Sequence, residues 1–386
     1  MRVHYSLGDL TPKNTAESAD AAPALKAKSW NFAQRTSYAP ASAQRLRAAD
    51  AADLQQLTGT SMGTHWQVRV RNPEFVPLEH IRSAIEAELE HVVRHMSHWE
   101  GDSALSRFNH ASADSWHALP DDLSHVLHAG LHWAQRSGGA FDPTLGRLVA
   151  AWGFGPHAPS DPTHWRPASS ASIQQAQASS GWQRLQHCPQ RGWRQSGGLH
   201  LDLSGIAKGY AVDAVLQRLH ALGLPHCLVE IGGELRASGQ RSAGQPWRVA
   251  IAPIPQTAGA VPNTPTNTPP EVLALRDGAI ATSGDLYHTH HWQGRSYSHT
   301  LDARSGQPIA HDLASVSVLH PECMHADALA TLLTVLGPEA GLAFAEQHDI
   351  AARLASAHAT HYSSAWRRYL SDTQTAATPP SSRPHG

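Results

Sequence analysis

Two residues near the C-terminal end of this 386-residue chain have the types and spacing to bind a metal ion. Asp327 and Thr331 are four residues apart in an apolar run, so a helix would present both on one face. A carboxylate and a hydroxyl are hard oxygen ligands of the kind that Mg²⁺ prefers, together with phosphate and water. The other interpretation is local: Asp327 caps the helix, and Thr331 bonds back to a backbone carbonyl.

A second candidate group surrounds Lys208. Residues 202–210, D-L-S-G-I-A-K-G-Y, predict the end of a strand, a glycine turn and the start of a helix with Lys208 in its first turn. A cation is disfavoured at a helix N-terminus unless an anion lies there. Lys208 therefore indicates either a phosphate or a partner carboxylate. The segment matches neither a Walker A motif nor a dinucleotide-binding fingerprint.

His299, in the stretch Y-S-H-T-L-D, is a candidate general base, because imidazole exchanges protons near neutral pH. It is one of 28 histidines, so its type alone does not separate a catalytic role from a structural one. His288, His290 and His291 are also close in sequence. No Cys or Glu completes a zinc-ligand pattern with them, and we predict no zinc site there.

Two glycine-rich segments could bring the backbone close to a ligand. Residues 59–63, G-T-S-M-G, match the G-x-S-x-G motif of hydrolases, which needs a strand, a sharp turn and a helix. The residues that follow alternate as in a strand, so we predict a hairpin or loop at Ser61 and no esterase nucleophile. Residues 137–144, S-G-G-A-F-D-P-T, are most simply a second turn.

The elements that must position these residues alternate in type. Apolar residues at helical spacing predict helices over residues 78–97, 207–222 and 326–336. Strands are predicted over residues 65–70, 199–203, 227–231, 247–252, 272–275 and 315–319. Because strands outnumber helices and several follow one another directly, we expect an α+β fold with antiparallel-rich sheets.

Composition limits the domain organisation and the partners. The chain is 41% apolar and 16% charged, and its net charge of −2 provides no field that would recruit nucleic acid. Its three cysteines are widely spaced, which predicts no disulfide framework. We expect tails over residues 1–50 and 371–386, one domain over residues 51–370, and low-complexity insertions near residues 156–198 and 254–270.

The order of the motifs is more specific than any one of them. The series G-T-S-M-G-T, M-S-H-W-E-G-D-S-A-L-S-R-F-N, G-G-A-F-D-P-T, D-L-S-G-I-A-K-G-Y-A-V-D, I-G-G-E, A-T-S-G-D, Y-S-H-T-L-D-A-R-S-G and A-D-A-L-A-T resembles the ApbE family, the FAD:protein FMN transferases. The resemblance runs from about Gly59 to Gly337. It implies a single α+β domain of the ApbE type, an α-β roll, that binds FAD and Mg²⁺. It also implies Mg²⁺-dependent transfer of the FMN half of FAD to a Ser or Thr of a target protein through a phosphoester bond, with release of AMP.

The resemblance also implies roles for particular residues. The expected FAD-binding residues are Met62, Trp99, Ala140, Phe141, Asp142, Asp202, Lys208 and Leu301. Mg²⁺ is expected to be held by the side chains of Asp327 and Thr331 and the carbonyl of Gly205, and His299 is expected to be the catalytic base. The chain departs from the family pattern at Trp99, where many relatives carry Tyr, and at Ala303, where Pro is usual.

The expected partner is an acceptor flavoprotein with an Asp-Gly-x-Ser/Thr-like motif. Residues 277–280 of this chain, D-G-A-I, carry Ile at the acceptor position, so self-flavinylation is not expected. Two other functions share the same fold and site: a Mg²⁺-dependent FAD pyrophosphatase that gives FMN and AMP, and a non-catalytic flavin-binding protein. The presence of His299 with Asp327 and Thr331 argues against the second of these.

The sequence shows no apolar run of about 20 residues that would span a membrane, and no apolar signal-peptide core near its N-terminus. We therefore expect no membrane span. For the sequence as it stands we expect a cytoplasmic location. If a leader precedes it, the family resemblance implies the periplasmic side, facing the inner membrane.

Overall fold

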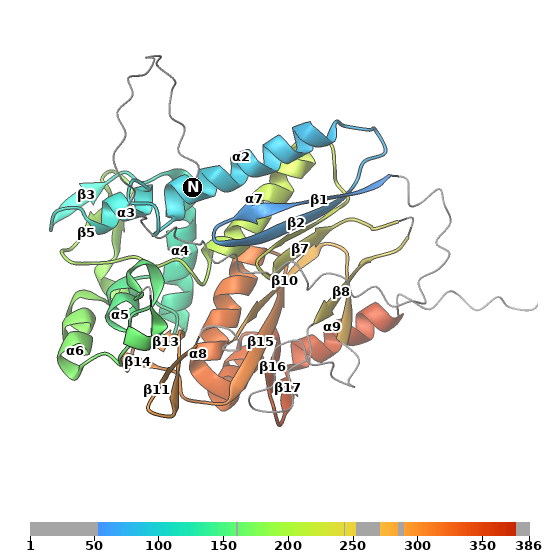
Figure 1. Cartoon of the computed structure of the whole chain (residues 1–386). Coiled ribbons are helices and arrows are strands. Elements are labelled where there is room, and N and C mark those ends of the chain that lie inside the picture. Colours follow the sequence, from blue (N-terminus) through green and yellow to red (C-terminus); the bar gives the residue numbers. More distant parts are fainter. Residues whose placement is uncertain (1–52, 160, 243, 252–270, 285–288, 376–386) are drawn as a thin grey trace, which may run out of the picture. The chain divides into compact units, whose positions relative to one another are not determined.

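An eight-stranded sheet forms the centre of the computed structural model, which describes residues 53–375 apart from 160, 243, 252–270 and 285–288 (Figure 1). The strand order is β1-β2-β6-β7-β10-β15-β16-β17, and every neighbouring pair is antiparallel. The expected α+β fold with antiparallel-rich sheets is confirmed. The predicted N-terminal tail and the insertion at residues 254–270 lie outside the described residues, as do residues 376–386 of the predicted C-terminal tail.

The strands of the central sheet are β1 (Leu54–Ser61), β2 (Thr64–Arg71), β6 (Cys227–Ile231), β7 (Glu234–Ser238), β10 (Gly278–Ser283), β15 (Leu313–His320), β16 (Ala351–Ser356) and β17 (Thr360–Tyr362). Smaller sheets contain β3 (Ser115–His117), β4 (Gln186–Cys188), β5 (Gly192–Gln195), β8 (Trp247–Ile251), β9 (Glu271–Leu275), β11 (Thr289–Trp292), β12 (Arg295–Ser298), β13 (Leu301–Asp302) and β14 (Gln307–Pro308).

The α-helices are α2 (Leu78–Met96), α3 (Ala104–Asn109), α4 (Asp121–Arg136), α5 (Gly146–Ala151), α6 (Ser170–Ser179), α7 (Ala207–Ala221), α8 (Cys323–Gln347) and α9 (Ser364–Thr375). Three short 3₁₀ helices are η1 (Gly155–His157), η2 (Pro162–His164) and η3 (Trp182–Arg184).

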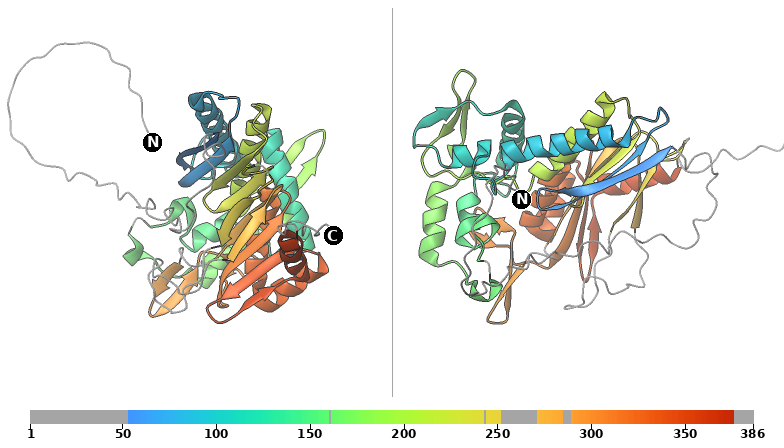
Figure 2. Two further views of the ribbon diagram at one scale, coloured as in Figure 1. Left: turned by 90° about the vertical axis from the view of Figure 1, so that its right-hand side faces the viewer. Right: turned by 45° about the horizontal axis from the view of Figure 1, so that its top comes forward.

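The central sheet is covered on both faces, because successive side chains of a strand point to opposite sides. On β10, Ala279 and Ala281 belong to the main core with helices α2, α7 and α8. Ile280 between them belongs to a second core, which contains the β8–β9 hairpin and Trp366 of α9. Figures 1 and 2 show the same arrangement, with α2, α7 and α8 on one face and α9 on the other.

Helix α8 is longer than the sequence predicted. Gly337 adopts φ 82° and ψ −178°, a conformation that breaks the helix, and Pro338 begins the continuation to Gln347. The prediction for residues 326–336 covered only the part before this break. Among the described residues α8 is the one helix long and apolar enough to cross a membrane, but 61% of its apolar window is buried inside the fold. Its apolar character is therefore explained by its place in the core, against β10, β15 and α7.

The predicted strand at residues 199–203 is wrong. The segment is buried and extended, but its one ladder contact is an isolated bridge between His200 and Leu145. Side chains take the place of a neighbouring strand: the Asn109 amide bonds both backbone groups of Leu201, and the Gln195 amide bonds both backbone groups of Leu199. An apolar sequence pattern predicts burial, but it does not predict whether the backbone groups pair with a strand or with side-chain amides.

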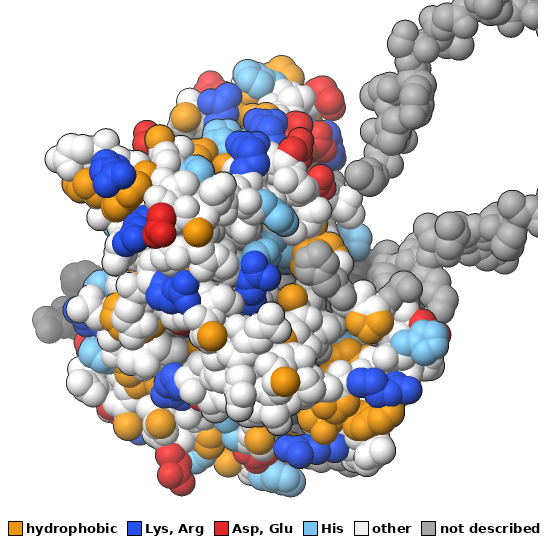
Figure 3. Space-filling model, turned by 90° about the vertical axis from the view of Figure 1, so that its left-hand side faces the viewer, with side chains coloured by type: hydrophobic (Ala, Val, Ile, Leu, Met, Phe, Trp, Pro, Cys, Tyr) orange, Lys and Arg blue, Asp and Glu red, His pale blue; other side chains and the backbone are white. Residues whose placement is uncertain are grey.

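The Pro- and Ser-rich segment at residues 156–198 contains regular elements in the structure. It includes α6, η3 and the β4 and β5 strands, and it buries Trp165 and Trp193 almost completely. Trp193 Nε1 donates to Ser124 Oγ on α4 at 2.9 Å. On the molecular face shown in Figure 3, basic and acidic side chains are scattered among neutral ones.

Candidate functional site

The three predicted metal ligands lie together where the turn before α7 meets α8. A Cβ atom at Gly205 would lie 2.9 Å from Thr331 Oγ1, so this turn passes directly beside the threonine side chain. Asp327 lies one turn earlier on α8, is 4% exposed, and accepts a hydrogen bond from the backbone N–H of Gly209 at 3.0 Å. The prediction that Asp327 and Thr331 share one face of a helix is confirmed. Asp327 caps the N-terminus of α7 through Gly209, and it does not cap its own helix α8.

Lys208 has a carboxylate partner in Glu234, at the start of β7. Lys208 Nζ lies 2.5 Å from Glu234 Oε1, and the two side chains are 31% and 4% exposed. The second oxygen, Glu234 Oε2, is buried and has no hydrogen-bond partner among the described residues. The sequence predicted either a phosphate or a carboxylate as the anion beside Lys208, and in the structure Glu234 is that carboxylate.

Charge and burial shift the pKa values in this group. Burial raises the pKa of Glu234 to about 7, against the opposing effect of Lys208. Burial also raises the pKa of Asp327, again opposed by Lys208. Burial by itself lowers the pKa of Lys208, but Glu234 and Asp327 outweigh it and the net shift is upward. Two buried carboxyl groups thus act on one lysine, and a divalent cation beside them would stabilise their charged forms.

No role was predicted for Asp213, the last residue of the motif D-L-S-G-I-A-K-G-Y-A-V-D. In the structure it fixes α8 against α7. Its carboxylate accepts hydrogen bonds from the backbone N–H groups of Cys323 and Met324, both at 2.9 Å, and from Arg236 Nη1 at 2.6 Å. The residues beside it on α7 are buried and apolar. The sequence signal for this structural role was a single carboxylate among the apolar residues of α7, because a buried charge needs dedicated hydrogen-bond or ion-pair partners.

The predicted flavin-binding stretch Ala140, Phe141 and Asp142 is a buried loop after α4. Asp142 Oδ1 accepts hydrogen bonds from the backbone N–H and the hydroxyl of Thr144, and Oδ2 accepts from the backbone N–H of Trp182. Burial raises the pKa of Asp142, and these hydrogen bonds oppose that shift. Its carboxylate is therefore occupied in holding the loop to η3.

Asp202 connects this loop to the metal-ligand group. Its backbone N–H donates to the carbonyl of Pro143 at 2.9 Å, and its carboxylate accepts from the backbone N–H of Ser204 at 2.8 Å. Since Gly205 follows directly, the Asp142 loop and the predicted metal ligands belong to one continuous region.

Met62 lies on a different segment, at the end of the central sheet where β1 turns into β2. It has φ 50° and forms, with Gly63 at φ 71°, the two-residue turn between β1 and β2, so the predicted hairpin at Ser61 is confirmed. The β6–β7 turn passes beside it: the N–H of Gly232 donates to the His65 carbonyl at 3.0 Å. That turn ends at Glu234.

The remaining predicted residues lie on other segments. Trp99 follows α2 and is 66% exposed. Leu301 is buried in β13, in an aromatic-rich cluster with α5 and α6. His299 lies between β12 and β13 and is partly exposed, and the adjacent backbone is fixed by a 2.8 Å hydrogen bond from Thr300 N–H to Ser298 Oγ.

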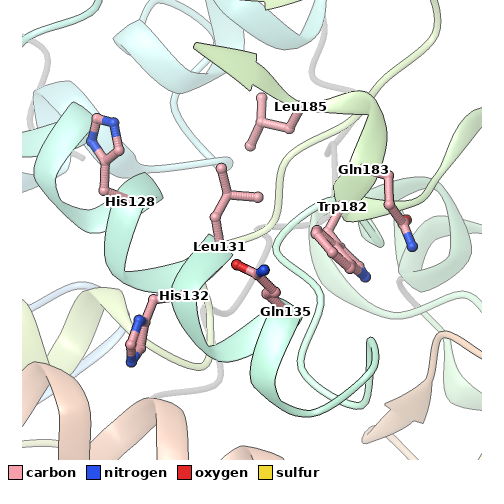
Figure 4. A pocket seen from close by; sticks show the side chains of 7 residues that line it. All are labelled: His128, Leu131, His132, Gln135, Trp182, Gln183 and Leu185. Carbon is pink, nitrogen blue, oxygen red and sulfur yellow. The ribbon is translucent and has the colours of Figure 1, made fainter.

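A hollow of about 370 Å³ on α4, η3 and the residue after η3 is lined by His128, Leu131, His132, Gln135, Trp182, Gln183 and Leu185 (Figure 4). None of these seven residues is a predicted flavin or metal ligand. The histidines near residue 290 also form no described metal group: His290 stacks on both Phe154 and Trp165, His291 bonds Ser296, and His288 lies outside the described residues.

Comparison with known proteins identifies the family. The ApbE family model matches residues 62–354. The FAD:protein FMN transferase of Vibrio cholerae is 35% identical over 303 residues, which are 78% of this chain and 86% of that protein. The FAD:protein FMN transferase of Klebsiella pneumoniae is 34% identical over 296 residues, 76% of this chain and 81% of that protein. The apo crystal structure of the Pseudomonas stutzeri flavinyl transferase ApbE matches with a TM-score of 0.73 at 37% identity, covering 82% of this chain and 96% of that one. This chain therefore belongs to the ApbE family.

Proposed function

We propose that this protein uses Mg²⁺ to transfer the FMN half of FAD to a Ser or Thr of another protein, through a phosphoester bond and with release of AMP. The chain is a FAD:protein FMN transferase, as its relatives are. The observation that carries the finer proposal is the meeting of Gly205, Asp327 and Thr331 close to Lys208 and its buried partner Glu234.

The residues present fit Mg²⁺. The donor set is a carboxylate, a hydroxyl and a backbone carbonyl, all hard oxygens, and the site keeps few protein ligands as Mg²⁺ requires. Glu234 Oε2, buried with no hydrogen-bond partner among the described residues, is a further oxygen acceptor close by. When bound, Mg²⁺ would neutralise charge on the pyrophosphate of FAD.

Lys208 is placed to exchange partners when the substrate binds. It pairs with Glu234 in the structure, yet its side chain is 31% exposed and lies in the first turn of α7, at the positive end of the helix dipole. A phosphate at this end of the helix would be met by the lysine. Lys208 therefore binds and orients the phosphates in our proposal.

His299 is the proposed general base, which takes the proton from the acceptor hydroxyl as the oxygen attacks phosphorus. Its position in a loop with a fixed neighbouring backbone suits this role. The same arrangement with water in place of the hydroxyl would give FMN and AMP, so the pyrophosphatase is the alternative that the test must separate.

The test is to incubate the protein with FAD, Mg²⁺ and an acceptor domain that carries an Asp-Gly-x-Ser/Thr-like motif. We expect flavin fluorescence on the acceptor band in a denaturing gel, together with AMP. An acceptor whose Ser or Thr is replaced by Ala is the matched control and should stay unlabelled. AMP and free FMN without a labelled acceptor would contradict the transferase and favour hydrolysis.

A further inference from the structure

Two histidines of α2 and one aspartate of α4 form a cluster apart from every residue assigned above. His91 and His95 are one helical turn apart, so their side chains lie on the same side of α2. Asp122 belongs to the first turn of α4. His95 Nδ1 lies 2.8 Å and 2.7 Å from the two Asp122 oxygens, and His91 Nε2 lies 3.2 Å from Oδ2.

We propose that His91, His95 and Asp122 form a site for Zn²⁺. One ligand atom from each residue lies within 4.8 Å of the other two. Zn²⁺ binds imidazole and carboxylate at about 2.0–2.2 Å, so tetrahedral ligands are roughly 3.3–3.6 Å apart. Small side-chain rotations bring the cluster to this spacing. Three protein ligands leave a fourth position for water.

An ordinary ion pair explains this cluster less completely. One imidazole is enough to pair with Asp122, yet two converge on it, with ring centroids 4.1 Å apart. Asp122 is held in place by the backbone N–H of Leu123 at 2.8 Å, and its side chain is 11% exposed. The His91 and His95 side chains are 43% and 23% exposed, so an ion can enter from solvent. A fixed carboxylate with two surface imidazoles is a ligand set for a borderline transition metal, whereas Mg²⁺ prefers oxygen ligands alone.

Zinc here would join α2 to the start of α4. The other end of α4 leads directly into the loop that carries Ala140, Phe141 and Asp142. A bound ion would therefore stabilise the helix that positions this loop, without contacting FAD.

The experiment measures Zn²⁺ binding by titration calorimetry against a competing chelator, with wild type, His91→Ala, His95→Ala and His80→Ala. His80 is an exposed histidine of the same helix and is the matched control. We expect one zinc site in wild type and His80→Ala. We expect an affinity at least about tenfold lower in the other two, since even outer-shell partners of metal ligands are worth roughly 10–100-fold. Circular dichroism checks that each variant is folded, and Asp122→Asn provides a variant of unchanged size with the same expected loss.

A thermal-unfolding measurement on two proteins completes the test. Saturating Zn²⁺ should raise the Tm of wild type and of Asp327→Asn alike, because a ligand that binds only the folded state stabilises it. Equal zinc affinity in wild type and His91→Ala would overturn the site, as would an equal loss in His80→Ala. Loss of the zinc effect in Asp327→Asn would place the ion in the α8 cluster and would also overturn it.

Discussion

Strand β7 and helix α7 are joined by two carboxylate–cation pairs that differ in how completely their oxygens are used. Asp213 of α7 pairs with Arg236 of β7, and both of its oxygens also accept backbone N–H groups of α8. Lys208 of α7 pairs with Glu234 of β7, whose second oxygen is buried with no hydrogen-bond partner among the described residues. The first pair is saturated and fixes three elements. The second retains unused acceptor capacity beside the predicted metal ligands.

The difference separates a structural role from a ligand-binding one. A buried acceptor without a partner destabilises the folded protein, so it persists where a ligand or ion completes it. The two pairs lie on the same helix and strand, and they therefore share much of their surroundings. Variants of each pair should give opposite patterns of stability and activity.

The largest expected effect concerns His299, the proposed general base for the chemistry at the Lys208–Glu234 pair. His299→Ala should slow transfer by about 10²–10⁴-fold, the usual contribution of a general base, while FAD remains bound. AMP release and acceptor labelling measure the rate, and flavin fluorescence measures binding. His291→Ala, an exposed histidine of the preceding hairpin, is the matched control and should keep full activity. Retained transfer in His299→Ala would remove this residue from its role.

The next effect concerns the saturated pair. Asp213→Ala should lower the free energy of unfolding by about 3–5 kcal/mol, because it leaves a partly buried Arg236 and two backbone N–H groups without their acceptor. Activity per folded molecule should stay close to that of wild type. Glu90→Ala, which removes an exposed ion pair with Arg94 on α2, should cost about 1 kcal/mol or less. Denaturant unfolding measures the free energy of unfolding of both variants. Equal losses would show that the Asp213 pair contributes no more than an exposed ion pair.

The smallest expected effect is the pH dependence of folding stability that the Lys208–Glu234 pair produces. The folded protein raises the pKa of Glu234 from 4.5 to about 7, so between these values it holds a proton that the unfolded chain has released. The stability gained from that proton is present at low pH and is lost as the pH rises through about 7. Glu234→Gln should remove this part of the slope in unfolding experiments from pH 5 to 8. Glu86→Gln, at an exposed site on α2, should keep the wild-type slope. Parallel curves for wild type and Glu234→Gln would contradict the raised pKa.

Much of this comparison could be predicted from the sequence, but one part could not. The periodicity of α7 and the spacing of Asp327 and Thr331 predicted the helices and their shared face, because helical geometry is local. Glu234 was visible as the last residue of I-G-G-E, yet its pairing with Lys208 depends on a contact between β7 and α7. The failure at residues 199–203 has the same cause, since the distant side chain of Asn109 takes the place of a strand. Local pattern predicts elements, and long-range packing decides which polar groups meet.

The most direct test of the proposed chemistry is a Mg²⁺ titration of FMN transfer by wild type and Asp327→Asn, with the acceptor analysed by mass spectrometry. Wild type should form one FMN adduct per AMP released, with a saturable dependence on Mg²⁺. Asp327→Asn keeps the size of the side chain but removes its charge, and it should lose the adduct and the AMP together at any Mg²⁺ concentration that saturates wild type. An unchanged Mg²⁺ titration in Asp327→Asn would contradict the assigned metal site and with it the account of the unsaturated pair.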